Sequence, residues 1–262
     1  MGVDLADIRE YQAGDDVRYM DWNVTARMDT PYVRVYHEDR ELTAWFLLDL
    51  SPSMDFGTVE SARRKRTVLI DFVTTLARLL TRRGNRVGAV LYGSQIERTV
   101  PARGGRIQVL HLVEELLRQP TPASAPFTDL APLLEFGGRA FKRRSMVFLI
   151  SDFICEPGWE KPLERLNRRH EVVAVRLLDP REVALPDMGP LIMEDAETGE
   201  QLYVDTHDGG FRRRFEAASE AREQAIGLAF RRAGVDALAL STDEDLVRAI
   251  VRMATLRRRR RR

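Results

Sequence analysis

Short apolar runs alternate with longer segments of helical periodicity from residue 44 almost to the end of the chain. An apolar run of about four to eight residues between polar turns is typical of a buried strand, whereas apolar residues at every third or fourth position are typical of an amphipathic helix. Strands that alternate with helices usually pair in parallel. The order therefore predicts an α/β domain with a mostly parallel sheet.

The apolar pattern also predicts where the elements begin and end. We expect buried strands at residues 44–49, 86–92, 145–150, 171–178 and 235–240. We expect helices at about 59–83, 106–118, 129–142, 159–169, 210–233 and 243–256. A short strand at 95–100 is expected to pair antiparallel with the strand before it, at an edge of the sheet.

Two pieces lie outside this alternation. Residues 190–205 have the pattern of a β-hairpin that turns at 197–199, and residues 32–36 alternate like a strand. We expect the two pieces to share a small peripheral β element at one edge of the sheet. The expected divisions are a first segment at 1–43 packed on the core, an α/β domain at 44–256 with a hairpin inserted at about 186–206, and a disordered arginine tail at 257–262.

Charge is distributed unevenly along the chain. The formal net charge is +1, but residues 257–262 are six consecutive arginines, and without them the charge becomes −5. A mildly acidic body has no reason to coat nucleic acid, so a nucleic-acid binder acting through the tail is a lesser alternative. Hydrophobic residues make up 44% of the chain, which is enough for a sizeable core.

The single cysteine, Cys155, excludes an internal disulfide and a cysteine-rich zinc site, and it suits a reducing compartment. No apolar run approaches the ~20 residues that span a bilayer. The N-terminus lacks the basic and apolar regions of a signal peptide. We therefore predict a soluble, cytoplasmic protein.

Polar side chains follow two of the predicted central strands. Asp49, Ser51 and Ser53 form a D-x-S-x-S pattern after the first strand, and Asp152 follows the strand at 145–150. Thr128 lies on a loop that enters a helix. Because ligands bind outside the carboxyl ends of strands in open α/β sheets, these five side chains are expected to face one crevice.

Carboxylate and hydroxyl oxygens suit a hard cation such as Mg²⁺ or Mn²⁺, and the absence of His and Cys disfavours Zn²⁺. Neutral hydroxyls leave the ion electron-poor, so it still attracts an acidic group from outside. This chemistry predicts a binding site and not an enzyme.

A hydrolytic site would need a base placed to activate water, and the chain offers no candidate among its four histidines, His37, His111, His170 and His207. The competing enzymatic hypothesis is a metal-dependent phosphohydrolase that uses Asp49 or Asp152. Phosphatase sites with an aspartate nucleophile place a second carboxylate two residues on, where this chain has Ser51.

Two sets of motifs resemble known families. The string LLDLSPSM, the later Thr128-Asp129-Leu130 and the SDF at 151–153 resemble the metal-ion-dependent adhesion site of von Willebrand factor A domains. Residues 4–40 resemble the signature segment of the domain-of-unknown-function-58 family, whose members carry an A-type domain directly after it, and the ETGE at 197–200 is similar to that family too. The chain begins almost at the signature, whereas family members usually carry more residues before it.

The resemblance implies a Rossmann-like sheet flanked by helices, von Willebrand factor A-like in fold. It implies that Ser51, Ser53 and Thr128 contact the ion directly, whereas Asp49 and Asp152 act mostly through water. Family members are commonly encoded beside MoxR-type AAA+ ATPases, which implies an adaptor or chaperone-like partnership with such an ATPase.

Charges of opposite sign alternate along the signature segment. We expect Trp22 to hold this segment against the domain and the charges to form solvent-facing salt bridges. The alternative is a docking surface for the ATPase. The charged residues are Arg9, Asp15, Asp16, Arg18, Asp21 and Arg27.

Overall fold

The computed structural model of the protein describes residues 3–38, 42–57, 63–120 and 128–260. Its contacts divide the chain into two units, Met1–Glu41 and Leu42–Arg262. Within the described ranges, no helix combines the length and the apolar character needed to cross a membrane.

The first unit is a two-stranded antiparallel sheet of β1 (Val3–Glu10) and β2 (Tyr32–Glu38), connected through a 3₁₀ turn, η1 (Val17–Tyr19), and helix α1 (Trp22–Met28). Asp16 caps the N-terminus of η1, and Asp21 caps the N-terminus of α1.

Five of the six alternating charges in the first unit take part in three ion pairs. Arg9 pairs with Asp15 at 2.7 Å and Arg18 pairs with Asp16 at 2.6 Å. The α1 cap Asp21 pairs with Arg34 of β2 at 2.8 Å, which ties α1 to β2. The expected packing of this segment on the core, and the role of Trp22 in it, stay predictions.

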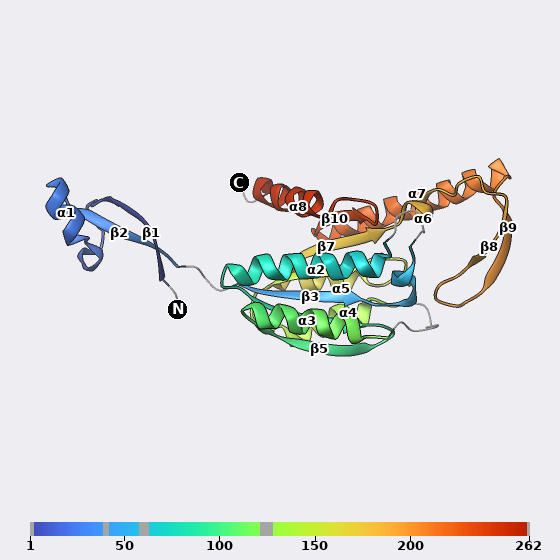
Figure 1. The fold of residues 1–262 in the computed structure, drawn as a ribbon, viewed down its shortest axis with the longest axis horizontal. Helices are drawn as coiled ribbons and strands as arrows, with labels where there is room; N and C mark the ends of the chain where they lie inside the picture. Colours follow the sequence, from blue (N-terminus) through green and yellow to red (C-terminus); the bar gives the residue numbers. More distant parts are fainter. Residues whose placement is uncertain (1–2, 39–41, 58–62, 121–127, 261–262) are drawn as a thin grey trace. The chain divides into compact units, whose positions relative to one another are not determined.

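The second unit is built on a six-stranded sheet with the order β10-β7-β6-β3-β4-β5 (Figure 1). Neighbouring strands pair in parallel except β5, which is antiparallel to β4. The expected α/β class is therefore confirmed. The strands are β3 (Thr43–Asp49), β4 (Arg86–Tyr92), β5 (Ile96–Arg103), β6 (Met146–Ser151), β7 (Glu171–Leu178) and β10 (Asp236–Ser241).

Helices cover both faces of this sheet, and the core is divided accordingly. A first core cluster joins one face to α2, α3 and α8, and a second core cluster joins the other face to α4, α5 and α7. The helices are α2 (Lys65–Arg82), α3 (Arg106–Arg118), α4 (Ala131–Ala140), α5 (Glu160–Arg169), α7 (Gly209–Ala233) and α8 (Leu246–Arg260), with the short α6 (Pro180–Val183) and a 3₁₀ turn, η2 (Pro52–Asp55).

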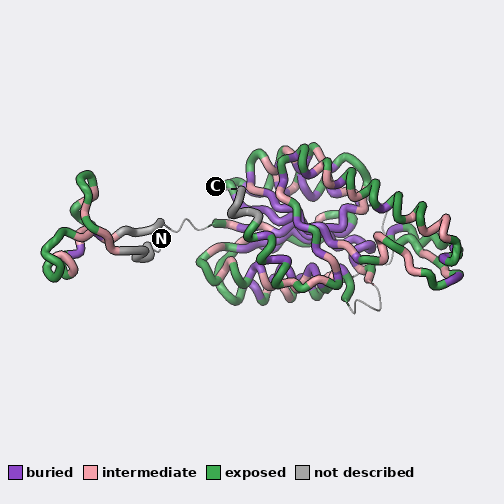
Figure 2. The backbone as a smooth tube through the Cα atoms, turned by 90° about the horizontal axis from the view of Figure 1, so that it is seen from above, coloured by how far each residue is buried: buried purple, intermediate pink, exposed green. Residues whose placement is uncertain are grey.

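Side chains of one strand alternate between the two clusters. Phe46 and Leu48 belong to the first core cluster, whereas Leu47 between them belongs to the second. Because both faces of the sheet are covered, the central strands are buried along nearly their whole length, as the apolar runs predicted (Figure 2).

The peripheral strands do not form the shared element that the sequence suggested. Strand β2 pairs with β1, whereas β8 (Pro190–Glu194) pairs with β9 (Gln201–Asp205) in a separate antiparallel hairpin. The expectation of a common β element was therefore wrong, although both pieces are antiparallel sheets. Hydrophobic alternation predicts a strand but carries no information about which strand lies beside it.

The end of the chain also differs from its prediction. We expected residues 257–262 to be a disordered tail, but α8 continues to Arg260. Arginine has a high helix propensity, so a run of arginines can extend a helix that has already formed. Residues 261–262 lie outside the described part, as do residues 58–62 near the expected start of the helix at 59–83.

Candidate metal centre

Five predicted ligands lie at the carboxyl ends of the central strands. Strands β3 and β6 are adjacent and parallel, so their ends meet at one edge of the sheet. Asp49 is the last residue of β3, and the chain then turns through Ser51 into η2, which contains Ser53. Asp152 directly follows β6, and Thr128 lies on the segment that enters α4. All five side chains are buried.

The Asp49 carboxylate organises the turn that follows β3. Its Oδ1 accepts a hydrogen bond from the backbone N–H of Ser51 at 3.0 Å, and its Oδ2 accepts one from the Ser151 hydroxyl at 2.6 Å. The hydroxyl oxygens of Ser51 and Ser53 lie 3.1 Å apart. The D-x-S-x-S segment therefore presents two adjacent hydroxyls beside a fixed carboxylate.

Asp152 is held by a lysine that sequence reasoning missed. The Nζ of Lys65, at the start of α2, lies 2.5 Å from Asp152 Oδ2 and 2.6 Å from Glu182 Oε1. The other oxygen of Asp152 accepts a hydrogen bond from the N–H of Ile154 at 3.0 Å. Both oxygens of Asp152 are thus engaged by protein groups, which suits an indirect role at an ion better than direct coordination.

The backbone after β6 is shaped by Phe153, which has a positive φ of 56°. This conformation is costly for a bulky side chain and persists only where packing imposes it. The Phe153 ring contacts Trp159 and Phe230 in the second core cluster. The aromatic packing thereby fixes the turn that carries Asp152.

A glutamate from the β8–β9 hairpin reaches the same edge. The Oε1 of Glu197 accepts a hydrogen bond from the N–H of Ser53 at 3.3 Å. Burial raises the pKa of the Glu197 carboxyl above its ordinary value. The neighbouring Thr128 hydroxyl lowers this pKa by a smaller amount. Thr128 therefore joins the cluster through Glu197.

Two buried polar atoms of this cluster have no hydrogen-bond partner in the described part of the chain: Thr128 Oγ1 and Glu197 Oε2. The two atoms lie close to each other, since Thr128 affects the pKa of Glu197, but they do not meet the geometry of a hydrogen bond, so an ion or a water between them would satisfy both. Two buried carboxyl groups, Asp49 and Glu197, likewise have no ion-pair partner among the described residues, unlike Asp152. Burial of a carboxylate without a cation is costly.

The electrostatics lead to the same conclusion. Burial, followed by the negative charge of Asp152, raises the pKa of Asp49 to about 6. Burial lowers the pKa of the Lys65 ammonium group, but the negative charges of Asp152 and Glu182 have a larger combined effect and raise it. Asp49 therefore keeps its negative charge less readily than an exposed carboxylate does, and no cation among the described residues pairs with it.

These residues fit a hard divalent cation. Within the described ranges, no group of three or more His, Cys, Asp or Glu side chains is arranged to hold a metal. The oxygens present are a carboxylate, three hydroxyls and an orphaned glutamate oxygen. This mixed set is of the kind that Mg²⁺ or Mn²⁺ accepts.

The sequence alone predicted that Asp49, Ser51 and Ser53 share one site, because these three residues are nearly consecutive. It missed four residues that the structure adds to the cluster: Lys65, Ser151, Glu182 and Glu197. For Ser151 the signal was its place beside Asp152 at a strand end, and for Glu197 it was the ETGE motif.

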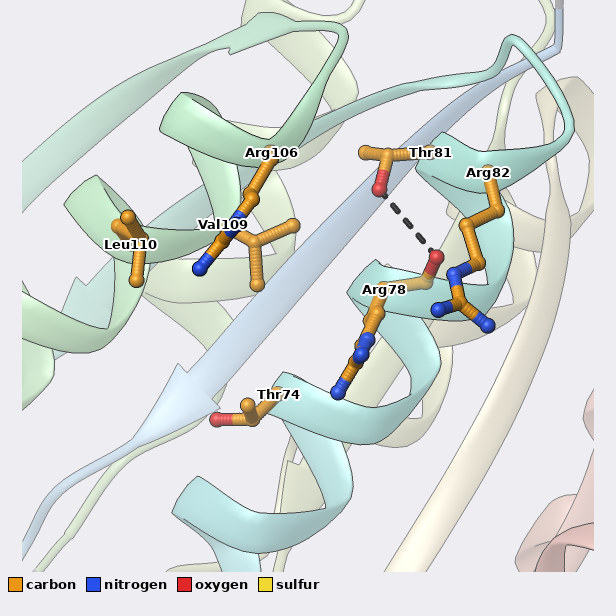
Figure 3. Close-up of a pocket in the computed structure, with 7 residues that line it drawn as sticks. All are labelled: Thr74, Arg78, Thr81, Arg82, Arg106, Val109 and Leu110. Carbon is orange, nitrogen blue, oxygen red and sulfur yellow. Dashed lines mark hydrogen bonds between the residues drawn. The ribbon is translucent and has the colours of Figure 1, made fainter.

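Two of the hollows on the described part of the second unit have nearly equal volumes. One, of about 450 Å³, separates the hairpin from the strand ends and is lined on the body side by Ser53, Phe56, Ile154 and Glu182. The other, of about 460 Å³, lies between α2 and α3, where Figure 3 shows arginines from both helices. The second hollow contains none of the candidate metal ligands, so it is separate from this site.

The sheet order, the helices on both faces and the polar cluster at the strand ends define a von Willebrand factor A-like domain. The chain belongs to the family described as "Protein of unknown function DUF58", which matches residues 7–225.

Two mycobacterial proteins are similar over nearly the whole chain. They are uncharacterized proteins of Mycobacterium tuberculosis (Rv1480) and Mycobacterium bovis (Mb1516), each 37% identical over 258 residues, covering 98% of this chain and 80% of the relative. Among solved structures, the conserved hypothetical protein BatB from Bacteroides thetaiotaomicron is similar in fold, with a TM-score of 0.52 at 14% identity, covering 82% of this chain and 99% of BatB.

Proposed function

We propose that this chain is a metal-dependent protein-interaction module and not an enzyme. The proposed ligands of a Mg²⁺ or Mn²⁺ ion are Ser51, Ser53 and Thr128 directly, with Asp49 and Asp152 acting mostly through water. The observation that carries the proposal is a buried site at the point where two central strands end, in which, among the described residues, Asp49 has no ion-pair partner and the Thr128 hydroxyl has no hydrogen bond. A cation would supply both the missing charge and the missing partner.

The donor set supports binding of an acidic partner. When bound, a divalent ion would supply positive charge that three neutral hydroxyls do not cancel. Lys65 keeps Asp152 fixed beside that position, and Ser151 does the same for Asp49. The protein thus holds its own oxygens rigidly and leaves the remaining attraction for a carboxylate from another protein.

The proposed partner is a MoxR-type AAA+ ATPase that presents an acidic side chain. Its support is the family resemblance together with the chemistry of the site. The chain would then act as an adaptor or a chaperone-like companion of the ATPase.

Metal binding is tested first, by thermal unfolding with increasing Mg²⁺ or Mn²⁺. A ligand that binds only the folded state stabilises it by mass action, by about 2.7 kcal/mol at a concentration about 100 times its Kd. We expect the unfolding midpoint of the wild type to rise, and Ser53→Ala to lose most of the rise. The matched control is Ser145→Ala, a buried serine whose hydroxyl bonds Arg143 O before β6 begins, and it should respond like the wild type.

Partner capture is tested next, with the purified ATPase in Mg²⁺ and in EDTA. We expect capture by the wild type only in Mg²⁺, and none by Asp49→Ala. Equal capture in both buffers would rule out the metal-dependent mechanism. A parallel assay with phosphate esters addresses the hydrolase alternative, and turnover that disappears in Asp152→Asn would favour that enzyme instead.

A further inference from the structure

We infer that Glu197 is an internal acidic ligand of the candidate metal centre, so that the β8–β9 hairpin occupies the place a partner's carboxylate would take. The inference rests on the proposed function and adds a means of regulation to the same site. A partner would then bind only when the hairpin releases the site.

The burial pattern of the hairpin sets Glu197 apart. Within the hairpin, residues 190–205, only Glu197 and Val204 are buried, at 5% and 6% exposure. Apolar hairpin side chains such as Leu202 and Tyr203 are exposed at 61% and 71%. Burying a carboxylate is costly, so a hairpin that buries Glu197 while it exposes apolar side chains such as Leu202 and Tyr203 is shaped in part around that carboxylate.

The turn of the hairpin positions this side chain. The Oδ1 of Asp195 accepts hydrogen bonds from the backbone N–H groups of Glu197 and Thr198, at 2.9 and 2.8 Å. Gly199 follows with a φ of 72°, which suits glycine and closes the loop. The loop is thus fixed by its own bonds, and the Glu197 side chain is left to extend toward Ser53.

The contacts of Glu197 satisfy only half of its carboxylate. Oε1 accepts from the Ser53 N–H, but Oε2 is buried with no hydrogen bond in the described residues, and neither oxygen has an ion-pair partner there. The nearby Thr128 Oγ1 is orphaned as well. One cation between these two oxygens would satisfy both, and it would sit among the proposed ligands.

A hollow lies beside the contact that Glu197 makes with the strand ends. The hollow of about 450 Å³ separates the hairpin from the strand ends around the Glu197 contact. Its rim on the hairpin side includes Glu194, Asp195 and Glu200, so an acidic partner is also repelled while the hairpin stays in place. An isolated two-stranded hairpin is only marginally stable, which makes its docking sensitive to one contact.

The test is amide hydrogen exchange of the full chain with and without Mg²⁺. In the wild type, Mg²⁺ should slow exchange across the hairpin, residues 190–205, by about tenfold or more, together with the segment at 49–55. Glu197→Gln keeps the carbonyl oxygen that accepts from Ser53 but removes the charge. In this variant Mg²⁺ should still protect the segment at 49–55 and should no longer protect the hairpin.

Glu200→Gln is the matched control, since Glu200 lies on the same hairpin with an exposed side chain, and it should behave like the wild type. If Mg²⁺ protects the segment at 49–55 but leaves the wild-type hairpin unchanged, or if Glu197→Gln matches the wild type, the inference is overturned while the proposed function stands. If Mg²⁺ changes neither segment, both are overturned.

A second readout uses a short acidic peptide as the probe in the presence of Mg²⁺. Glu197→Gln should bind this peptide about tenfold more tightly than the wild type, because no internal carboxylate competes. Equal affinity of the two proteins for the peptide would contradict the displacement of Glu197 by a partner.

Discussion

At the scale of single residues, one lysine balances two of the buried carboxyl groups. Lys65 is fully buried and contacts both Asp152 and Glu182, whose own carboxyl also caps the N-terminus of α6. Such a pair or triad adds little stability compared with apolar residues, but removing one member leaves unpaired charge inside the protein. Lys65 is therefore a structural cation that the candidate site depends on.

We expect Lys65→Met to lower the free energy of unfolding by about 3 kcal/mol, because two carboxyl groups lose their cation. Urea unfolding followed by circular dichroism measures this loss. Lys161→Met, an exposed lysine on α5, is the control and should change stability by less than about 0.5 kcal/mol. Similar losses in the two variants would contradict the role given to Lys65.

How far the site could be predicted depends on distance along the chain. Asp49, Ser51 and Ser53 form a local pattern that a sequence displays directly. Glu197 meets Ser53 across 144 residues and Lys65 meets Asp152 across 87, and no local periodicity encodes such contacts. Lys65 also lies in a run of basic residues at 63–66, and nothing in the sequence distinguishes it from the arginines beside it.

At the scale of elements, buried strands were the most predictable part. The bounds of β4, β7 and α3 agree with the sequence expectation to the residue, because apolar runs end where the chain leaves the core. Strand β1 and helix α1 were not predicted. The sequence of β1, VDLADIRE, is half charged, and its strand conformation depends on pairing with β2.

Helix α2 gives a test of the core at this scale. We expect Phe72→Ala to lower the free energy of unfolding by about 3 to 5 kcal/mol, because the ring is fully buried in the first core cluster. Leu79→Ala on the same helix is the control, since Leu79 is 46% exposed, and it should cost about 1 kcal/mol or less. Denaturant titration of both variants checks the difference, and equal costs would contradict the assigned helix faces.

At the scale of the whole molecule, both hydrophobic core clusters belong to the second of the two units. Every residue of both core clusters lies between Ala44 and Met253, within the unit Leu42–Arg262. The candidate metal ligands lie in the same unit. The segment at residues 4–40 that resembles the family signature, in contrast, lies in the unit Met1–Glu41.

We therefore expect Leu42–Arg262, expressed alone, to unfold in one cooperative transition and to keep its response to Mg²⁺. Calorimetry with and without the ion measures both properties. A broad transition, or loss of the Mg²⁺ response in the shortened chain, would instead support the expectation that residues 1–43 pack on the core and complete it.

Helix α2 also connects the candidate site to a remote part of the second unit. It begins at Lys65 and runs for 18 residues, about 27 Å at 1.5 Å per residue. Along this length it packs against α3 and α8 in the first core cluster. A packed helix moves as a stiff rod. A small displacement of the Lys65 ammonium group would therefore tilt the far end of α2 and shift α3 and α8 beside it. Binding of an ion at the site would then change a surface far from the ion.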